Sequence, residues 1–463
     1  MTLEEVARAT GGHVADVTDP TTLITGAVTF DSRQAGPGDL FLALPGEHVD
    51  GHEYAAAALS AGAVAVLADR PVGAPAIVVD DVLAALSLLA REVLGRLPQV
   101  TVVGITGSSG KTSTKDLVAQ LLGRLGTTVA PPGSYNNELG HPYTVLLAGT
   151  DTRYLVLEYS ARGIGHIAAL CRVARPDIAV VLNVGTAHIG EFGSAEVIAR
   201  AKAELVQPLD ADSVAVLNID DPRVAAMAAS TQARVVFTGS SDSADVRAED
   251  VRLDAHGRPS YTLVTAGGRA KVQLPLYGRH HVANSLSAAA VAIELGMPVA
   301  DVAGALATVG TPSRWRMEVS ERPDGVTVIN DAYNANPDSM RAALEALLAI
   351  GRGRRTWAVL GQMAELGDRA RAEHEALGRL VNDLGIDRLV AVGDEASHVH
   401  AGAELEGSRR MESVNVPDIE GALQVLREEV GPGDVVLVKA SRAVGLERVA
   451  LALLADEPVE GHA

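Results

Sequence analysis

The chain has 463 residues, 47% hydrophobic and 21% charged, which is enough for about three domains with buried cores. Its 39 Lys and Arg against 58 Asp and Glu residues give a net charge of −19, which disfavours nucleic acid and anionic membrane surfaces as partners. The single cysteine, Cys171, excludes an intrachain disulfide and fits a reducing cytoplasm.

Residues 1–97 are expected to form a small α/β domain. Its N-terminus lacks the basic and apolar regions of a signal peptide. The apolar runs of the whole chain stop short of the ~18 residues that a membrane helix needs, so we expect no membrane span and a cytoplasmic location. Four strands are predicted at 28–32, 40–44, 63–68 and 76–80. Two helices are predicted at 52–62 and 81–97. Leu97-Pro98 ends the second helix and marks a linker.

Residues 98–311 are expected to form a second domain around a mostly parallel sheet. Strand-like runs alternate with helical stretches, which is typical of a sheet covered on both faces. Alternation on both sides of Gly267-Gly268 predicts a hairpin at 261–274, and a helix over 283–296 is expected to end at Gly296. The strands are predicted at 100–105, 154–158, 178–183 and 214–218.

Residues 312–463 repeat the α/β rhythm and predict a third, Rossmann-like domain. Its strands are expected at 326–330, 356–360, 388–392 and 434–438. The fold class is therefore α/β in three domains: a small N-terminal domain, a central nucleotide-binding domain and a C-terminal doubly wound domain.

The stretch "TGSSGKT" at 106–112 follows a strand and opens a helix, as a phosphate-binding loop does. Its glycines let the backbone wrap phosphate oxygens, and the helix N-terminus faces them. Lys111 supplies a charge to the terminal phosphates and Thr112 offers a hydroxyl to Mg²⁺. The common longer loop has glycine where this chain has Ile105, so an ordinary strand-to-helix turn remains the alternative. The candidate nucleotide residues of this segment are Thr106, Gly107, Ser108, Ser109, Gly110, Lys111, Thr112 and Ser113.

Two further side chains lie where parallel strands end. Glu158 closes the strand at 154–158, and His188 lies in the loop after 178–183. A carboxylate and an imidazole beside a triphosphate are natural ligands for Mg²⁺ or Mn²⁺. Taken singly, a solvated charge and a polar surface residue are the plainer interpretations.

Lys202 shares one face of a predicted helix with Ile198 and Leu205. A lysine in an apolar stripe needs a partner or a shifted pKa, unless its stem packs and its amine reaches solvent. From the pattern alone, the packed stem is favoured.

The C-terminal domain offers three polar strand ends. Asp331 follows the strand at 326–330, and Asn336 before Pro337 is typical of a helix N-cap. Glu365 lies in the next such loop. A basic cluster that includes Lys439 and Arg442 suits an anionic or zwitterionic substrate, with surface solvation as the alternative.

Together these motifs resemble the Mur ligases, ATP-dependent enzymes that build the peptide stem of bacterial cell-wall precursors. The resemblance covers nearly the whole chain and includes the short loop at 106–112. Its other segments are "FDSRQAGPGDLFLAL" from Phe30, "SYNNELGHP" at 134–142, "HIGEFGSAEVIARAKAEL" at 188–205 and "INDAYNANPDSM" at 329–340. The last of these resembles the branch that adds D-alanyl-D-alanine.

The resemblance implies roles for individual residues. Lys111, Lys202 and His188 would be catalytic, with Lys202 carbamylated, which reverses the preference for a packed stem. Glu158, His188 and Thr112 would be Mg²⁺ ligands. The nucleotide would also be held by Asn284, Arg316, Asp331 and Asn334, and the UDP-linked substrate by Ser32, Arg33, Asn136 and Asn137.

The implied reaction is the joining of D-alanyl-D-alanine to UDP-N-acetylmuramoyl-tripeptide through an acyl phosphate, driven by ATP with Mg²⁺. We expect a monomer. A sister Mur ligase or an amide ligase similar to folylpolyglutamate synthase is the alternative, and a nucleotide switch without ligase chemistry is a more distant one. Two departures from the family pattern are Tyr159-Ser160 after Glu158, and His281 where asparagine is common.

Overall fold

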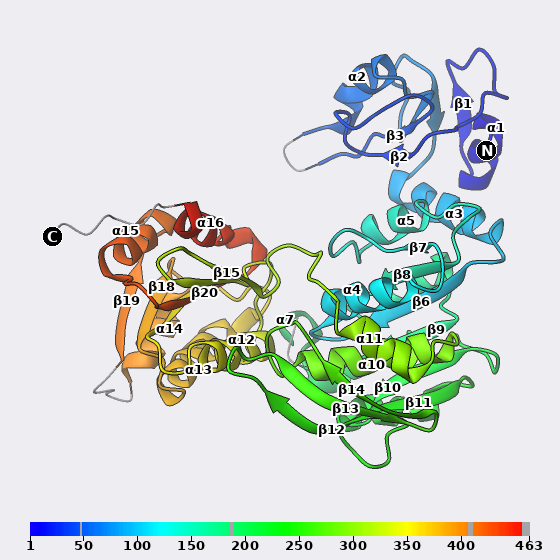
Figure 1. Cartoon of the computed structure of the whole chain (residues 1–463). Coiled ribbons are helices and arrows are strands. Elements are labelled where there is room, and N and C mark those ends of the chain that lie inside the picture. Colours follow the sequence, from blue (N-terminus) through cyan, green and yellow to red (C-terminus); the bar gives the residue numbers. More distant parts are fainter. Residues whose placement is uncertain (47–48, 186–188, 406–410, 456–463) are drawn as a thin grey trace. The chain divides into compact units, whose positions relative to one another are not determined.

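The computed structural model describes residues 1–46, 49–185, 189–405 and 411–455 (Figure 1). By its internal contacts, the chain separates into two compact units, each built from more than one segment. The first comprises Met1–Gly104, Gly126–Ser160 and Gly165–Ile178. The second comprises Ile105–Leu125, Ala161–Ile164 and Ala179–Ala463.

The first unit contains a small sheet in the order β1-β5-β4-β3-β2. Its neighbours pair in parallel except β1, which is antiparallel to β5. Leu42 and Ile77 pack on one face, whereas Phe41 and Val66 pack on the other, because successive side chains alternate along a strand. Its elements are α1 (Leu3–Thr10), β1 (His13–Ala15), β2 (Val28–Thr29), β3 (Leu40–Leu42), η1 (Gly51–Tyr54), α2 (Ala55–Ser60), β4 (Ala65–Ala68), β5 (Ala76–Val78) and α3 (Val82–Gly95).

The four strands and two helices predicted for this region are confirmed. The expected helix at 52–62 begins as the short 3-10 turn η1 before it continues as α2. β1 was not expected, because its three residues are at least partly exposed and give no apolar run.

A larger sheet has, in the described residues, nine strands in the order β14-β13-β12-β11-β10-β9-β6-β8-β7. The pairs β7–β8, β10–β11 and β11–β12 are parallel, and β12–β13–β14 is antiparallel. Its strands are β6 (Thr101–Thr106), β7 (Thr128–Val129), β8 (Tyr154–Glu158), β9 (Ile178–Val181), β10 (Val214–Asn218), β11 (Arg234–Gly239), β12 (Val246–Leu253), β13 (Pro259–Thr265) and β14 (Gly268–Gln273). The helical segments of this region are α4 (Lys111–Leu122), α5 (Gly140–Val145), α6 (His166–Val173), α7 (Ile189–Phe192), α8 (Ala195–Ala203), α9 (Pro222–Ala225), η2 (Ala226–Ser230), α10 (His281–Glu294) and α11 (Val299–Leu306).

The predicted hairpin is confirmed as β13 and β14, with Thr265 paired to Gly268 at its end. The predicted helix is confirmed as α10, and Gly296 follows it with φ +92°.

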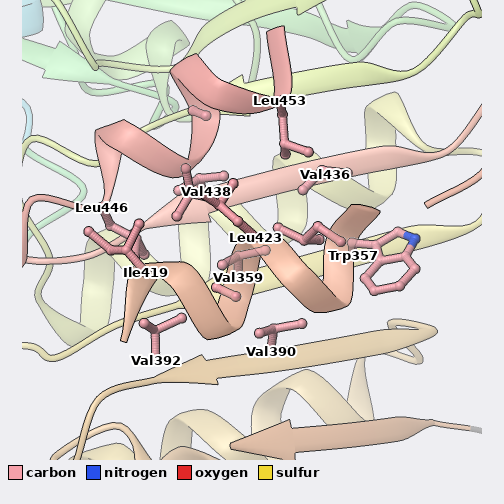
Figure 2. Packing of buried hydrophobic residues seen from close by; sticks show 14 of the residues in the cluster. Trp357, Val359, Val390, Val392, Ile419, Leu423, Val436, Val438, Leu446 and Leu453 are labelled. Atoms are coloured by element: carbon pink, nitrogen blue, oxygen red, sulfur yellow. The ribbon is translucent and has the colours of Figure 1, made fainter. Parts of the chain in front are cut away.

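The third sheet has, in the described part of the chain, six strands in the order β15-β16-β20-β17-β18-β19. All neighbours are parallel except β15, which is antiparallel to β16. Trp357 and Val436 on the sheet pack against Leu423 of α15 and Leu453 of α16 (Figure 2). The elements are β15 (Glu318–Glu321), β16 (Thr327–Asn330), α12 (Pro337–Ile350), β17 (Thr356–Leu360), η3 (Gly367–Arg369), α13 (Ala370–Asp383), β18 (Arg388–Val392), α14 (Ser397–Glu404), β19 (Glu412–Val416), α15 (Ile419–Glu429), β20 (Val435–Lys439), η4 (Arg442–Val444) and α16 (Glu447–Ala455).

The predicted fold class is confirmed: the described residues form three sheets with covering helices, and the C-terminal sheet is doubly wound. Asn336 caps α12, and Pro337 is its first residue, as predicted. Among the helices of the described segments, none has the length and apolarity that a membrane crossing requires.

Candidate active site

The phosphate loop joins β6 to α4. Hydrogen bonds from the chain just after β9, the neighbour of β6 in the sheet, hold the loop backbone in shape. Asn183, just after β9, accepts with Oδ1 from the Ser108 and Ser109 N–H groups at 2.9 and 3.0 Å. Its Nδ2 donates to the Ser109 carbonyl at 3.2 Å. Ser108 in turn accepts with its hydroxyl from the Gly185 N–H at 2.9 Å. Protein hydrogen bonds therefore hold the loop backbone in shape, as a preorganised anion site requires.

Gly110 caps α4 without a side-chain hydrogen bond, in the left-handed conformation at φ +80°. A Cβ at this position would lie 2.6 Å from Asn284 Oδ1, so glycine is needed both for the backbone and for space. Asn284 lies on α10 and is buried. The predicted nucleotide residues Gly110 and Asn284 are thus adjacent.

Gly107 is similarly confined, because a Cβ there would lie 2.9 Å from Leu182 Cβ. Thr106 is fully buried at the end of β6, and Ser113 is half-buried on the first turn of α4. Lys111 folds back over the loop, and its Nζ donates to the Gly107 carbonyl at 2.6 Å. This places a cation at the N-terminus of α4, where a terminal phosphate would also be attracted.

Lys202 is buried on α8, together with Ile198, as the helical pattern predicts. Its pKa lies well below the ordinary value, first because burial penalises the ammonium form and second because Lys111 adds positive charge nearby. The amine is therefore biased toward its neutral, nucleophilic form, and a solvated amine does not describe this site.

Arg316 reaches the phosphate loop from the segment that leads into β15. Its Nη2 donates to Thr112 Oγ1 at 3.2 Å, and its guanidinium lies 4.2 Å from the centroid of the Tyr333 ring. The neighbours Trp315 and Met317 both have positive φ, +58° and +50°. Such conformations cost roughly 1–3 kcal/mol each in non-glycine residues and persist only where contacts enforce them.

Asp331 and Lys439 form a buried ion pair at the ends of β16 and β20. Lys439 Nζ lies 2.6 Å from Asp331 Oδ2 and donates to the Asn334 carbonyl at 2.8 Å. Asp331 Oδ1 accepts from the Met317 N–H at 3.1 Å. Burial lowers the pKa of Lys439 and the adjacent carboxylate partly opposes that shift. Lys439 thus neutralises Asp331.

The other residue of the expected basic cluster also has an internal partner. Arg442 pairs with Glu447 at 2.7 Å, and its guanidinium lies 4.3 Å from the centroid of the Trp315 ring. The cluster therefore contributes to the structure around the 315–317 bend.

The segment 308–316 runs antiparallel along α4, from its C-terminal end to the phosphate loop. Residue numbers fall along α4 and the residues just after it as they rise along the segment, so side chains from the whole length of the helix bind it. The contacts are Arg124–Thr308 (2.6 Å), Gln120–Gly310 (2.8 and 3.2 Å), Lys115–Ser313 (3.3 Å) and Arg316–Thr112 (3.2 Å). Lys115 is fully buried in this stripe and also pairs with Asp116 at 2.6 Å.

Glu158 ends β8 with its carboxylate fully buried, and Asn136 Nδ2 donates to it at 3.4 Å. The next residue, Tyr159, is also fully buried. Its hydroxyl donates to the Ala174 carbonyl at 2.5 Å, and its ring contacts that of His141 edge-on at 4.6 Å. The first family departure therefore places an aromatic ring in the core.

The remaining predicted substrate residues, and Asn334 of the predicted nucleotide residues, lie near chain turns. Arg33 is exposed and pairs with Asp31 at 2.8 Å, which with the local backbone lowers the pKa of that carboxyl to about 2. Ser32 is half-buried in the same turn. Asn137 Oδ1 accepts from the Gly140 N–H at 2.9 Å, at the start of α5. Asn334 is exposed, and its Oδ1 accepts from the Ala335 N–H at 2.9 Å.

His281, the second departure, is buried on the first turn of α10. Neither ring nitrogen has a hydrogen-bond partner among the described residues. Its pKa lies well below the ordinary value because of burial and the adjacent His280, whose ring centroid is 4.2 Å away. The side chain at this position is therefore a neutral imidazole, with one donor and one acceptor nitrogen.

His188, predicted as catalytic and as a metal ligand, lies outside the described residues. Within the described ranges, no group of three or more His, Cys, Asp or Glu residues could hold a metal by itself. Thr112 in the second unit and Glu158 in the first unit each offer a buried oxygen ligand, the type that Mg²⁺ prefers and commonly combines with water and substrate phosphates. The chemistry of each of these two side chains, taken by itself, fits Mg²⁺.

Three family models match the chain. The Mur ligase family, catalytic domain, matches residues 25–97, the Mur ligase middle domain matches 105–292, and the Mur ligase, glutamate ligase domain matches 315–442. The UDP-N-acetylmuramoyl-tripeptide–D-alanyl-D-alanine ligase of Mycobacterium leprae is 52% identical over 509 residues, which cover 98% of both chains.

Solved structures agree with the sequence comparison. A crystal structure of MurF from Acinetobacter baumannii has a TM-score of 0.87 and 32% identity, covering 98% of this chain and 99% of that one. MurF ligase from Thermotoga maritima, in complex with ADP, has a TM-score of 0.80 and 33% identity, covering 93% of this chain and 97% of that one.

Proposed function

Because the chain belongs to the Mur ligase family, we propose that it joins D-alanyl-D-alanine to UDP-N-acetylmuramoyl-tripeptide in peptidoglycan precursor synthesis, converting ATP to ADP and phosphate. The observation that carries this proposal is the preorganised phosphate loop. Its shape is fixed by Asn183, and its cation, Lys111, is already placed over it. Together with 52% identity to the UDP-N-acetylmuramoyl-tripeptide–D-alanyl-D-alanine ligase of Mycobacterium leprae, this loop favours nucleotide chemistry and an amide product.

The reaction needs the terminal carboxylate of the tripeptide to become a better electrophile. Transfer of the γ-phosphoryl group of ATP to that carboxylate gives an acyl phosphate and ADP. The amine of D-alanyl-D-alanine then attacks the acyl carbon, and the tetrahedral intermediate expels phosphate. The attacking nitrogen loses its proton, so the products are the amide and inorganic phosphate.

The chain's own residues have distinct tasks in this scheme. The loop N–H groups and Lys111 bind the phosphates and offset the charge that develops during transfer. Arg316 brings a second cation to Thr112 from the 315–317 bend. Asn284, packed against Gly110, holds the start of α10 beside the loop. Exclusion of water from the closed site would protect the acyl phosphate from hydrolysis.

Thr112, Glu158 and His188 are the proposed Mg²⁺ ligands. When bound, Mg²⁺ supplies charge neutralisation on the phosphates.

Lys202 is proposed to be carbamylated. The neutral amine that burial favours can add to CO₂, forming a C–N bond and releasing one proton. The resulting carbamate is an anion on a long stem, which would complement a cationic centre instead of repelling it.

We further propose domain boundaries at 1–97, 98–311 and 312–463, and a monomer that acts in the cytoplasm. The family matches at 25–97, 105–292 and 315–442 lie within these ranges and support the boundaries.

A ligation assay tests the function. We expect phosphate release to require both UDP-N-acetylmuramoyl-tripeptide and D-alanyl-D-alanine, and mass spectrometry to detect the UDP-linked pentapeptide. Tripeptides with lysine or diaminopimelate at the third position should be compared in parallel. Phosphate release that needs neither substrate would point to a nucleotide switch, and ligation of a single amino acid would point to a sister ligase.

A further inference from the structure

Lys439 is a buried cation with no task in the reaction scheme above. The residue is 2% exposed, at the carboxyl end of β20. Its Nζ holds one turn of chain at three points: Asp331 Oδ2 at 2.6 Å, the Asp331 carbonyl at 3.4 Å and the Asn334 carbonyl at 2.8 Å. A lysine so placed cannot reach out to a substrate without breaking this turn.

Asp331 extends the constraint to the 315–317 bend. While Oδ2 faces Lys439, Oδ1 accepts from the Met317 N–H at 3.1 Å. The Trp315 carbonyl accepts from the Tyr333 N–H at 3.2 Å, two residues after Asp331. The same turn therefore holds the bend on both sides of Arg316.

The bend requires this support because Trp315 and Met317 both have positive φ, which L-residues rarely adopt. Between them, Arg316 projects to Thr112 Oγ1 at 3.2 Å. If the bend relaxed, the direction of Arg316 would change while its chemistry stayed the same.

The charges near the bend also bear on the direction of Arg316. Arg316 lies close enough to Lys439 that its positive charge helps to lower the pKa of Lys439. Without Lys439, the Asp331 carboxylate would be buried without its ion-pair partner, and Arg316 is a nearby cation that could replace that partner. Arg316 would then turn away from the phosphate loop.

We propose that Lys439 is a positioning residue for the ATP-dependent step: through Asp331 and Met317 it fixes the 315–317 bend and directs Arg316 to Thr112. This inference rests on the proposed function and adds to it a residue that need not touch substrate.

The test is a double-mutant cycle between Lys439→Met and Arg316→Ala, two residues that the hydrogen bonds of Asp331 connect through the bend. Lys439→Met should lower kcat/KM for ATP on the order of tenfold to a hundredfold, the scale of a misplaced catalytic group, with KM for the UDP-tripeptide unchanged. In the Arg316→Ala background, the same change should have little further effect on ATP kinetics. If the two losses multiply instead, Lys439 acts independently of Arg316 and the proposal is wrong.

A matched control separates positioning from stability. Arg354 holds the opposite end of the same sheet, donating to the carbonyls of Gly433 and Gly325 at 2.6 and 2.7 Å. Arg354→Met should lower the melting temperature with ATP kinetics unchanged. If Lys439→Met shows that same pattern, its role is structural only. Should Lys439→Met not fold, the Asp331→Asn/Lys439→Met variant removes the unpaired charge and takes its place in the cycle.

Calorimetric titration with ADP and Mg²⁺ gives a readout that does not depend on the acceptor substrate. Lys439→Met is expected to weaken this binding, and Arg354→Met to leave it intact. Unchanged ADP affinity together with unchanged ATP kinetics would overturn the inference. Absence of ligation in the wild-type enzyme would overturn only the proposed function, because the binding comparison would still stand.

Discussion

Gly110→Ala is expected to cost activity far more than stability. The substitution leaves every phosphate-binding N–H group in place but adds one methyl group to the cap of α4. At φ +80°, a non-glycine residue costs about 1–2 kcal/mol, which corresponds to a fall in melting temperature of roughly 2–8 °C. This part of the effect comes from the backbone alone.

The methyl group also has no room. It would lie 2.6 Å from Asn284 Oδ1, and Asn284 is only 6% exposed, so neither the helix nor the loop can yield without moving a proposed nucleotide contact. A displacement of about 1 Å in such a site can cost on the order of a hundredfold in rate. We expect a loss of that size in kcat/KM for ATP.

Gly165→Ala is the matched control. Gly165 also caps a helix, α6, in the left-handed conformation without a side-chain hydrogen bond, at φ +90°. A Cβ there meets no atom of the described residues within 4 Å. Phosphate-release kinetics and thermal unfolding of both variants separate the two effects. Similar losses of stability with similar, near-normal activity would refute the steric reasoning at Gly110.

The other predictions concern charge. Lys111→Ala should reduce ligation by roughly a thousandfold or more, measured by product formation, with the melting temperature nearly unchanged; near-normal turnover would exclude the phosphate-loop role. Lys202→Ala should lose activity and regain part of it with added acetate, whereas Lys202→Arg should stay inactive because guanidinium cannot form the carbamate; an active arginine variant would contradict carbamylation. Burial lowers the pKa of His141 to about 3 in the folded chain. As pH falls below the ordinary pKa of histidine, the unfolded chain therefore takes up this proton before the folded chain does. Stability should therefore drop by about 2 kcal/mol between pH 6.5 and 5 from this residue. His141→Phe keeps an aromatic ring beside Tyr159 and should remove that part of the pH dependence in urea unfolding; an unchanged pH dependence would contradict the assignment.

The strands that sequence reasoning found are those with continuous apolar runs. β16, β17 and β20 are buried at every position, as strands in the middle of a parallel sheet must be. β15 and β19 form the edges of the same sheet and are at least partly exposed at every position except Val416, so their polar sequences resemble loops. Edge strands are defined by their neighbours more than by their own composition.

The same distinction applies to the site. The loop at 106–112 was predictable because glycine, lysine and threonine at fixed spacing encode its geometry locally. Asn183 was missed although it follows β9 at a strand end, the position already used to select Glu158. The Asp331–Lys439 pair joins residues 108 positions apart, and Lys115 contacts Ser313 across 198 positions. No local pattern predicts such pairs, because their partners are chosen by the fold.

Tyr159 shows how a departure from a family pattern can be absorbed locally. Along β8 and just beyond it, side chains alternate, so Glu158 and Tyr159 leave the backbone in opposite directions. The Tyr159 ring fills space against Gly104, where a Cβ would lie 2.8 Å from Tyr159 Cε2. The His141 ring lies beside the Tyr159 ring, and the Tyr159 hydroxyl donates a hydrogen bond to the Ala174 carbonyl. The bulk of Tyr159 is thus accommodated within the core by glycine on β6 and by contacts on the side of the strand opposite to the Glu158 side chain.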